Sequence, residues 1–168
     1  YARYAAVIDG GNNRLLFGKN EDTKVPMAST TKIMTCIIAL ENAPELPAKN
    51  MTPFCYYRMF YDCKSLQIAP SLPAETLADN CYLSMFSGCS ALETAPALPA
   101  MTLANSCYKE MFYNCTSLQA APSLPATTLE PYCYDSMFSG CKSLSMAPET
   151  LPALELKDYC YQKMFQNC

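Results

Sequence analysis

A unit of 26 residues recurs along most of this 168-residue chain. Its second copy runs from Pro70 to Ala95 and reads PSLPAETLADNCYLSMFSGCSALETA; the copies share the pattern P-x-L-P-A-x-x-L-x-x-x-C-Y-x-x-M-F-x-x-C-x-S-L-x-x-A. A fixed period of this length is typical of solenoids, in which each unit buries its apolar face only against its neighbours. The sequence therefore predicts five stacked units, residues 44–69, 70–95, 96–121, 122–147 and 148–168, the last with one extra residue near Thr150.

Each unit contains an extended part and a compact part. Prolines on both sides of Leu98 exclude a helix there and leave room for a strand of about three or four residues, which we expect to pair in parallel with its counterpart one repeat away. In the compact part, Cys81, Met85 and Cys89 recur at i, i+4 and i+8, a spacing that predicts one apolar stripe of a short helix. The expected fold class is an α/β solenoid of short parallel strands and short helices.

Comparing the copies with one another separates invariant columns from variable ones. Invariant apolar columns are expected to form the core, because every unit must present the same surface to its neighbours. The tyrosine after the first cysteine is equally invariant, so a packing role is favoured over a ligand-binding one. The predicted core columns are Leu72, Leu98 and Leu124; Cys81, Cys107, Cys133 and Cys160; Met85, Met111 and Met137; Phe86, Phe112 and Phe138; and Leu92, Leu118 and Leu144.

Residues 1–43 are different in kind from the repeats. Two short apolar runs, Ala5 to Asp9 and Arg14 to Phe17, flank the cluster Gly10 to Asn13, and this arrangement predicts a β-hairpin. A helix is predicted from Ile33 to Asn42, with Ser29 well placed as its N-cap.

The segment YAAVIDGGNNRLLFGKNEDTKVPMASTTKIMTCIIALENA resembles the N-terminal part of the penicillin-binding D-alanyl-D-alanine carboxypeptidases. In that family a hairpin leads into a helix whose first turn bears an S-x-x-K motif. The resemblance implies that Ser29 is the acylated nucleophile and Lys32 its proton acceptor. A lysine one turn after a serine at a helix start is close enough to take its proton.

Two further motifs of that family, an S-x-N and a K-T-G, do not occur in this sequence. The simpler interpretation, in which Ser29 caps a helix and Lys32 is solvated, is therefore favoured. The hairpin and helix could then serve as an N-terminal cap that covers the first repeat, with Ile33, Ile37 and Leu40 as candidate contacts. The rival interpretation is an accidental join of two unrelated pieces. The chain starts at a tyrosine and stops partway through a unit, so we expect it to be an excerpt of a longer one.

The repeats themselves resemble a second family. The motif F-x-x-C-x-S-L with a preceding L-P is similar to the BspA-type leucine-rich repeats of bacterial surface proteins, although those units are usually somewhat shorter. The resemblance covers residues 44–168 and implies a curved right-handed solenoid with strands on one face. It also implies a secreted or surface location outside the cytoplasm and a role in adhesion or in binding surface components.

The cysteines form two columns of five, eight residues apart, with Cys36 separate. Two cysteines eight apart on a helix are about 12 Å apart, too far for a disulfide within one unit. C-x7-C is not a zinc spacing and the chain has no histidine, so no metal and no cofactor is predicted. Reduced, buried thiols that act as small packing groups are favoured over disulfides between units.

The remaining properties bear on partners. Residues 44–168 hold seven Lys/Arg and eleven Asp/Glu, a mildly acidic balance without a basic stripe, which argues against nucleic acid. No apolar run is long enough to span a membrane. The leading functional hypothesis is a non-enzymatic module that binds a protein or glycan on its strand face; the alternative is a truncated serine carboxypeptidase acting on peptidoglycan. The candidate binding residues are the variable positions after the conserved leucine: Gln67, Ile68, Glu93, Thr94, Gln119, Ala120, Ser145 and Met146.

Overall fold

The computed structural model describes residues 5–8, 15–19, 46 and 48–168. At the start of the chain, β1 (Ala5–Ile8) and β2 (Leu15–Lys19) pair antiparallel, with Ala5 opposite Lys19 and a register shift between Val7 and Ile8. This pairing lies where the sequence predicts a hairpin. The predicted helix over residues 33–42, the pair Ser29 and Lys32, and the three candidate cap contacts all lie outside the described residues.

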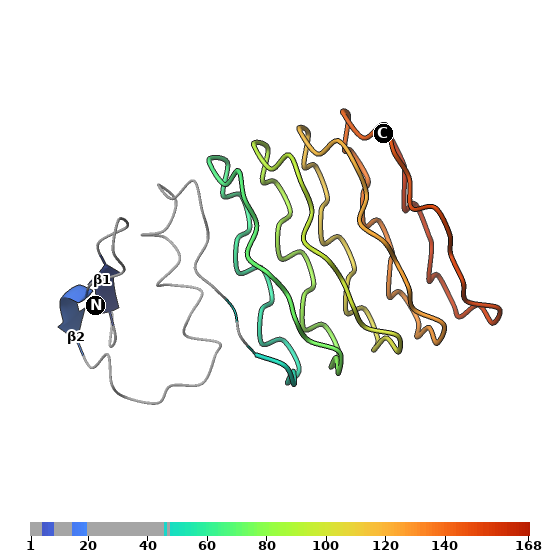
Figure 1. The fold of residues 1–168 in the computed structure, drawn as a ribbon, viewed down its shortest axis with the longest axis horizontal. Helices are drawn as coiled ribbons and strands as arrows, with labels where there is room; N and C mark the ends of the chain where they lie inside the picture. The colour runs from blue at the N-terminus through green and yellow to red at the C-terminus, as the bar shows by residue number, and fades with distance from the viewer. Residues whose placement is uncertain (1–4, 9–14, 20–45, 47) are drawn as a thin grey trace.

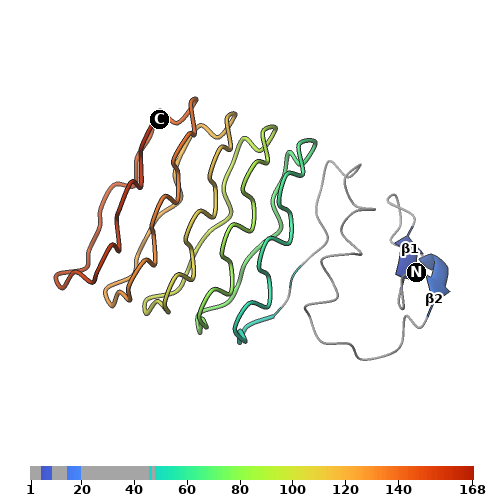
Figure 2. The ribbon, with the colours of Figure 1, turned by 180° about the vertical axis from the view of Figure 1, so that it is seen from behind.

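Residues 48–168 form a stack of coils, one coil for each 26-residue unit (Figures 1 and 2). Neighbouring coils are joined by parallel β-bridges between residues at the same place in consecutive units. One column of bridges links Ile68, Thr94, Ala120 and Met146. The parallel pairing one repeat apart, predicted from the sequence, is therefore confirmed, but each strand is reduced to a single bridge because a proline follows two residues later, as Pro70 follows Ile68.

A second column of bridges, which the sequence pattern did not predict, lies on the other side of the prolines. It links Asn50, Thr76, Thr102 and Thr128. The sequence does contain an indication of this second column. Threonine recurs at this place in three consecutive units, and its β-branched side chain favours an extended backbone.

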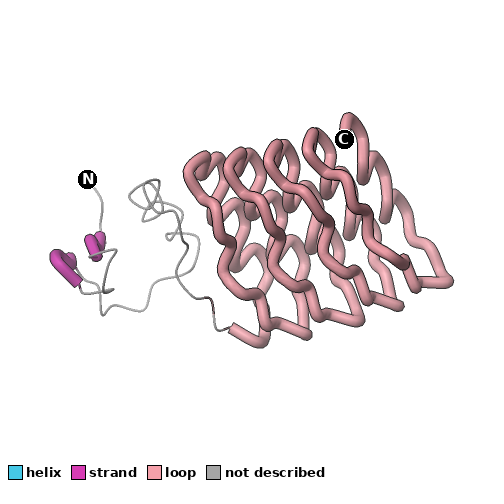
Figure 3. Tube along the Cα trace, turned by 45° about the horizontal axis from the view of Figure 1, so that its top comes forward, coloured by secondary structure: helices cyan, strands magenta, loops and turns pink. Residues whose placement is uncertain are grey.

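The compact part of each coil is not a helix, which corrects the prediction for residues such as Cys81 to Cys89. Among the described residues the structure has no helix, and the only continuous strands are β1 and β2 (Figure 3). The compact part is a run of overlapping turns in which every fourth residue has a positive φ, for example Ser106 at 52°, Glu110 at 54° and Asn114 at 57°.

The hydrogen bonds explain why turns replace the helix. In the third coil, alternate N–H groups donate within the coil, as from Met111 to the carbonyl of Tyr108 at 3.2 Å. The N–H groups between them donate to the next coil, as from Phe112 to the carbonyl of Met137 at 2.9 Å. A helix would satisfy all of these groups internally. The turns leave half of these N–H groups free to donate hydrogen bonds to the neighbouring coil, so each coil depends on the next.

Two walls thus make up each coil. The turn wall consists of the overlapping turns, residues 54–63, 80–89, 106–115, 132–141 and 159–168, and the bridge wall consists of the extended segments that carry the two bridge columns. The predicted core columns fill the space between the walls, and all of their residues are buried except Leu144, which is half-buried.

Aromatic rings continue through the core from coil to coil. The phenylalanines stack face to face, with ring centroids 5.5 Å apart for Phe60 and Phe86 and 5.6 Å apart for Phe86 and Phe112. The tyrosines form a second such ladder, in which Tyr82 and Tyr108 are 5.7 Å apart and buried. The packing role predicted for the tyrosine column is therefore confirmed for these rings.

Candidate binding surface

The eight candidate binding residues lie together on the bridge wall, and we call them the bridge row: Gln67, Ile68, Glu93, Thr94, Gln119, Ala120, Ser145 and Met146. The first bridge column runs through the row, so equivalent residues of four consecutive coils lie side by side. All eight are exposed except Ala120, which is half-buried. Ile68 and Met146, one at each end of the row, each leave 58% of their surface accessible to solvent.

Backbone hydrogen bonds fix the spacing of the row. Gln119 donates its N–H to the carbonyl of Glu93 at 3.2 Å, and Ser145 donates to the carbonyl of Gln119 at 3.0 Å. The Ser145 hydroxyl donates to the same Gln119 carbonyl at 3.3 Å. Because the main chain carries these contacts, the other side chains of the row can vary without loss of the stack.

Two kinds of groove on the bridge wall were not predicted from the sequence. One, of about 330 Å³, is lined mainly by prolines and alanines that come after the bridge row, including Pro70, Pro73, Pro96 and Pro99. The other lies beside the second bridge column between neighbouring coils, where Thr76 and Thr102 line a space of about 520 Å³. An equivalent groove of about 480 Å³ adjoins Thr128. The proline spacing and the threonine column are the sequence features that could have indicated these grooves.

The cysteines pack and donate hydrogen bonds. None of the ten described cysteines forms a disulfide. In the second column, Cys89 donates its thiol to the carbonyl of Phe60 at 3.0 Å, and Cys115 donates to that of Phe86 at 3.1 Å. Burial raises the pKa of the Cys81 thiol to about 12. The buried thiols therefore stay protonated near neutral pH, which removes the thiolate that nucleophilic or metal-binding chemistry requires.

Among the ten described cysteines, alkylation of the folded protein should therefore be confined to the least buried thiols. We expect iodoacetamide at mildly alkaline pH to modify Cys168, which is exposed, and more slowly Cys55, which is half-buried. Thiols such as Cys107, which is buried and whose pKa is raised well above its usual value by that burial, should react only after denaturation. Mass spectrometry of the digested protein measures each site, and rapid native modification of Cys107 would contradict the packing of this column.

Metal-binding and membrane-spanning features are absent from the part of the chain that the structure describes. There, no three or more Cys, Asp or Glu side chains gather in a way that could hold a metal ion. No helix among the described residues is long and apolar enough to cross a membrane. The candidate catalytic pair Ser29 and Lys32 lies outside this part of the chain, so its geometry is not described.

Comparisons with protein-family models, with characterised proteins and with solved structures gave no match to this chain. The two family resemblances thus depend only on the sequence motifs that carry them.

Proposed function

We propose that the chain is a non-enzymatic leucine-rich repeat module of a secreted or surface-exposed bacterial protein, and that it binds a protein or glycan ligand through the bridge row. The observation that supports this most directly is the contrast between two kinds of column. The core columns are invariant and, apart from Leu144, buried, whereas the columns of the bridge row are variable and, apart from Ala120, exposed. In repeat arrays the exposed variable positions of a shared surface commonly bind partners.

The chemistry of the row suits an elongated ligand. One line of positions carries polar side chains able to form hydrogen bonds, and the adjacent line carries mainly small or apolar ones. Glu93 is the single charged side chain among the eight. A ligand lying along the stack would thus meet an apolar strip flanked by hydrogen-bonding groups. The polar line consists of Gln67, Glu93, Gln119 and Ser145, and the adjacent line of Ile68, Thr94, Ala120 and Met146.

Two matched threonine variants test this proposal. Thr94 and Thr102 are both exposed, and each bridges a neighbouring coil on both sides, but they belong to the first and the second bridge column. Beads coated with the protein should adhere to cultured epithelial cells or to bacterial cells. We expect Thr94→Arg to reduce that adhesion about tenfold, because a long charged side chain would cover the row. Thr102→Arg, a similar change outside the row, should leave adhesion near that of the unchanged protein.

Two results would overturn the proposal. The first is equal adhesion by the Thr94→Arg and Thr102→Arg beads, or no adhesion by beads carrying the unchanged protein. The second is covalent labelling of Ser29 by a fluorescent penicillin, which would favour the carboxypeptidase alternative. Circular dichroism of both variants checks that neither change has unfolded the stack.

A further inference from the structure

The turn wall repeats every two coils rather than every coil. The first and third units carry Tyr61-Asp62 and Tyr113-Asn114 at the place where the second and fourth carry Ser87-Gly88 and Ser139-Gly140. Four residues before the second member of each pair, long charged side chains alternate with serine in the same way: Arg58, Ser84, Glu110 and Ser136. The fifth unit again carries longer side chains, with Lys163 in the place of Ser136 and Gln166-Asn167 in the place of Ser139-Gly140.

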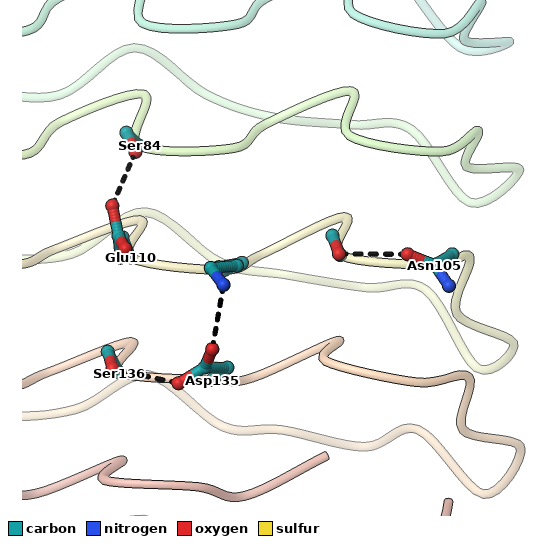
Figure 4. Close-up of polar contacts among 7 residues, drawn as sticks. Ser84, Asn105, Glu110, Asp135 and Ser136 are labelled. Atoms are coloured by element: carbon teal, nitrogen blue, oxygen red, sulfur yellow. Dashed lines mark hydrogen bonds and ion pairs between the residues drawn. The ribbon is translucent and has the colours of Figure 1, made fainter. Parts of the chain in front are cut away.

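Side chains of the odd coils cover the even coils. The Ser84 hydroxyl donates to Glu110 at 3.0 Å, and the two point toward one another across neighbouring coils (Figure 4). A Cβ atom added to Gly88 would collide with the carboxylate of Asp62, and one added to Gly140 would collide with the Asn114 amide oxygen. Each glycine has a φ near +80°, which larger residues rarely adopt. The glycines therefore leave space that their neighbours' side chains fill.

The result is a wall of alternating ridges and troughs. On the ridges, 46% of Tyr61 and 38% of Tyr113 is exposed. In the trough between them Ser87 is buried and Gly88 is half-buried. Coils stack at ~4.8 Å, so the two ridges are about 10 Å apart. Asp62 and Asn114 follow the two tyrosines in the chain, and their side chains lie against Gly88 and Gly140 of the next coil.

We propose that this turn-wall surface binds an unsubstituted β-1,4-linked glucan, with Tyr61 and Tyr113 each stacking on a sugar ring. In a β-1,4-linked chain every sugar is turned over relative to the one before it, so alternate sugars present the same face. The length of this two-sugar repeat is close to the distance between the two tyrosine ridges, which are two coils apart. Exposed tyrosines supply rigid apolar faces for sugar C–H groups, and Asp62 and Asn114 supply acceptors for sugar hydroxyls.

The troughs and the charges narrow the choice of sugar. The trough beside Gly88 already holds the Asp62 side chain, so it leaves no depth for an N-acetyl group on the sugar. The charged side chains of the turn wall carry both signs. Arg58 lies over one face of the Tyr61 ring, 4.9 Å from the ring centroid, so a sugar would stack on the other face. Lys109 pairs with Asp135 at 2.9 Å. Such a balanced surface favours an uncharged polysaccharide over an acidic one.

Calorimetric titration of the full chain with cellohexaose tests the proposal. We expect measurable binding, and we expect the double variant Tyr61→Ala/Tyr113→Ala to bind about tenfold more weakly or worse, because both stacking rings are lost. Tyr159→Ala is the matched control. Tyr159 is also an exposed tyrosine of the turn wall, but it stacks on Tyr132 in a different column, so its loss should leave the affinity unchanged.

The two-coil spacing has its own test. Ser87→Tyr places a third ring in the trough and removes the alternation, so it should weaken cellohexaose binding as much as the double variant does. Equal affinity for maltohexaose, tighter binding of chitohexaose, or full affinity in the double variant would overturn the proposal. Thr94→Arg lies on the other wall and should bind cellohexaose normally, so failure of the bridge-row proposal and failure of this one are distinguishable.

Discussion

Replacing Phe112 by alanine is expected to lower the free energy of unfolding by roughly 3–5 kcal/mol. Phe112 is fully buried in the middle coil, and its ring stacks on Phe86 and on Phe138, with centroids 5.6 Å apart in both cases. Removing the ring leaves a cavity and ends the ladder on both sides. Because Phe112 packs against the coils on both sides of its own, the loss weakens two interfaces together. Urea unfolding followed by circular dichroism measures the change.

Phe165→Ala is the matched control for this prediction. Phe165 occupies the same column in the last coil, but 38% of it is exposed and it stacks on Phe138 alone, at 5.5 Å. Its removal should lower the free energy of unfolding by less than about half as much as Phe112→Ala does. Less apolar surface leaves the core, and one neighbouring coil is affected instead of two. Equal losses from the two variants would show that the middle of the stack gains nothing from its two-sided packing.

The core and the pairing of coils could be predicted from the sequence because identical units must meet identical neighbours. The invariance of Met85, Met111 and Met137 identified buried positions without knowledge of the backbone, and all three are buried. The same comparison placed the bridge row on one surface. Leu144 is the partial exception, since it is half-buried although its column is invariant.

The local backbone was predicted wrongly for a physical reason. Cys81, Met85 and Cys89 keep a period of four, whereas a helix turns once in 3.6 residues, so its apolar stripe should also use positions three residues apart. The recurrence of Asp, Asn and Gly at one fourth-residue position, as at Asp62, Gly88 and Asn114, was the second signal of positive φ. Hydrogen bonding between coils, which a single unit cannot reveal, then stabilises turns over a helix.

The surfaces were only partly predictable. Variation between single units identified the bridge row. The same unit-by-unit comparison does not reveal a pattern that repeats every two units. The alternation of Tyr61-Asp62 with Ser87-Gly88 has a two-unit period, and its meaning depends on the overlap of side chains from adjacent coils. The grooves beside Thr102 and Pro96 likewise depend on the space between coils, so no single unit contains the information.

Alkaline pH is expected to unfold the stack cooperatively. Burial raises the pKa of Cys81, Cys133 and Cys141 from 9.0 to about 12, and it raises the pKa of Tyr82 well above 10.0. A raised pKa in the folded state means that the unfolded chain releases these protons first. The stability that the protonated groups contribute is complete below pH 9 and is lost as the pH rises toward 12. Full ionisation of one such thiol in the unfolded chain lowers the free energy of unfolding by about 4 kcal/mol. The total free energy of unfolding of a domain is only about 5–15 kcal/mol.

The midpoint of this unfolding should therefore fall between the unfolded and folded pKa values of the thiols. Thiolate and tyrosinate absorbance should rise together with the loss of circular dichroism, and return to neutral pH should restore both signals. Cys133→Ala removes one titrating group, so the slope of unfolding free energy against pH should fall by up to about 1.4 kcal/mol per pH unit. Met137→Ala, in the same coil, removes a buried side chain that does not titrate, and should lower stability at every pH without changing the slope. Gradual ionisation of the thiols with the fold intact would instead mean that water reaches the cysteine columns in the native stack.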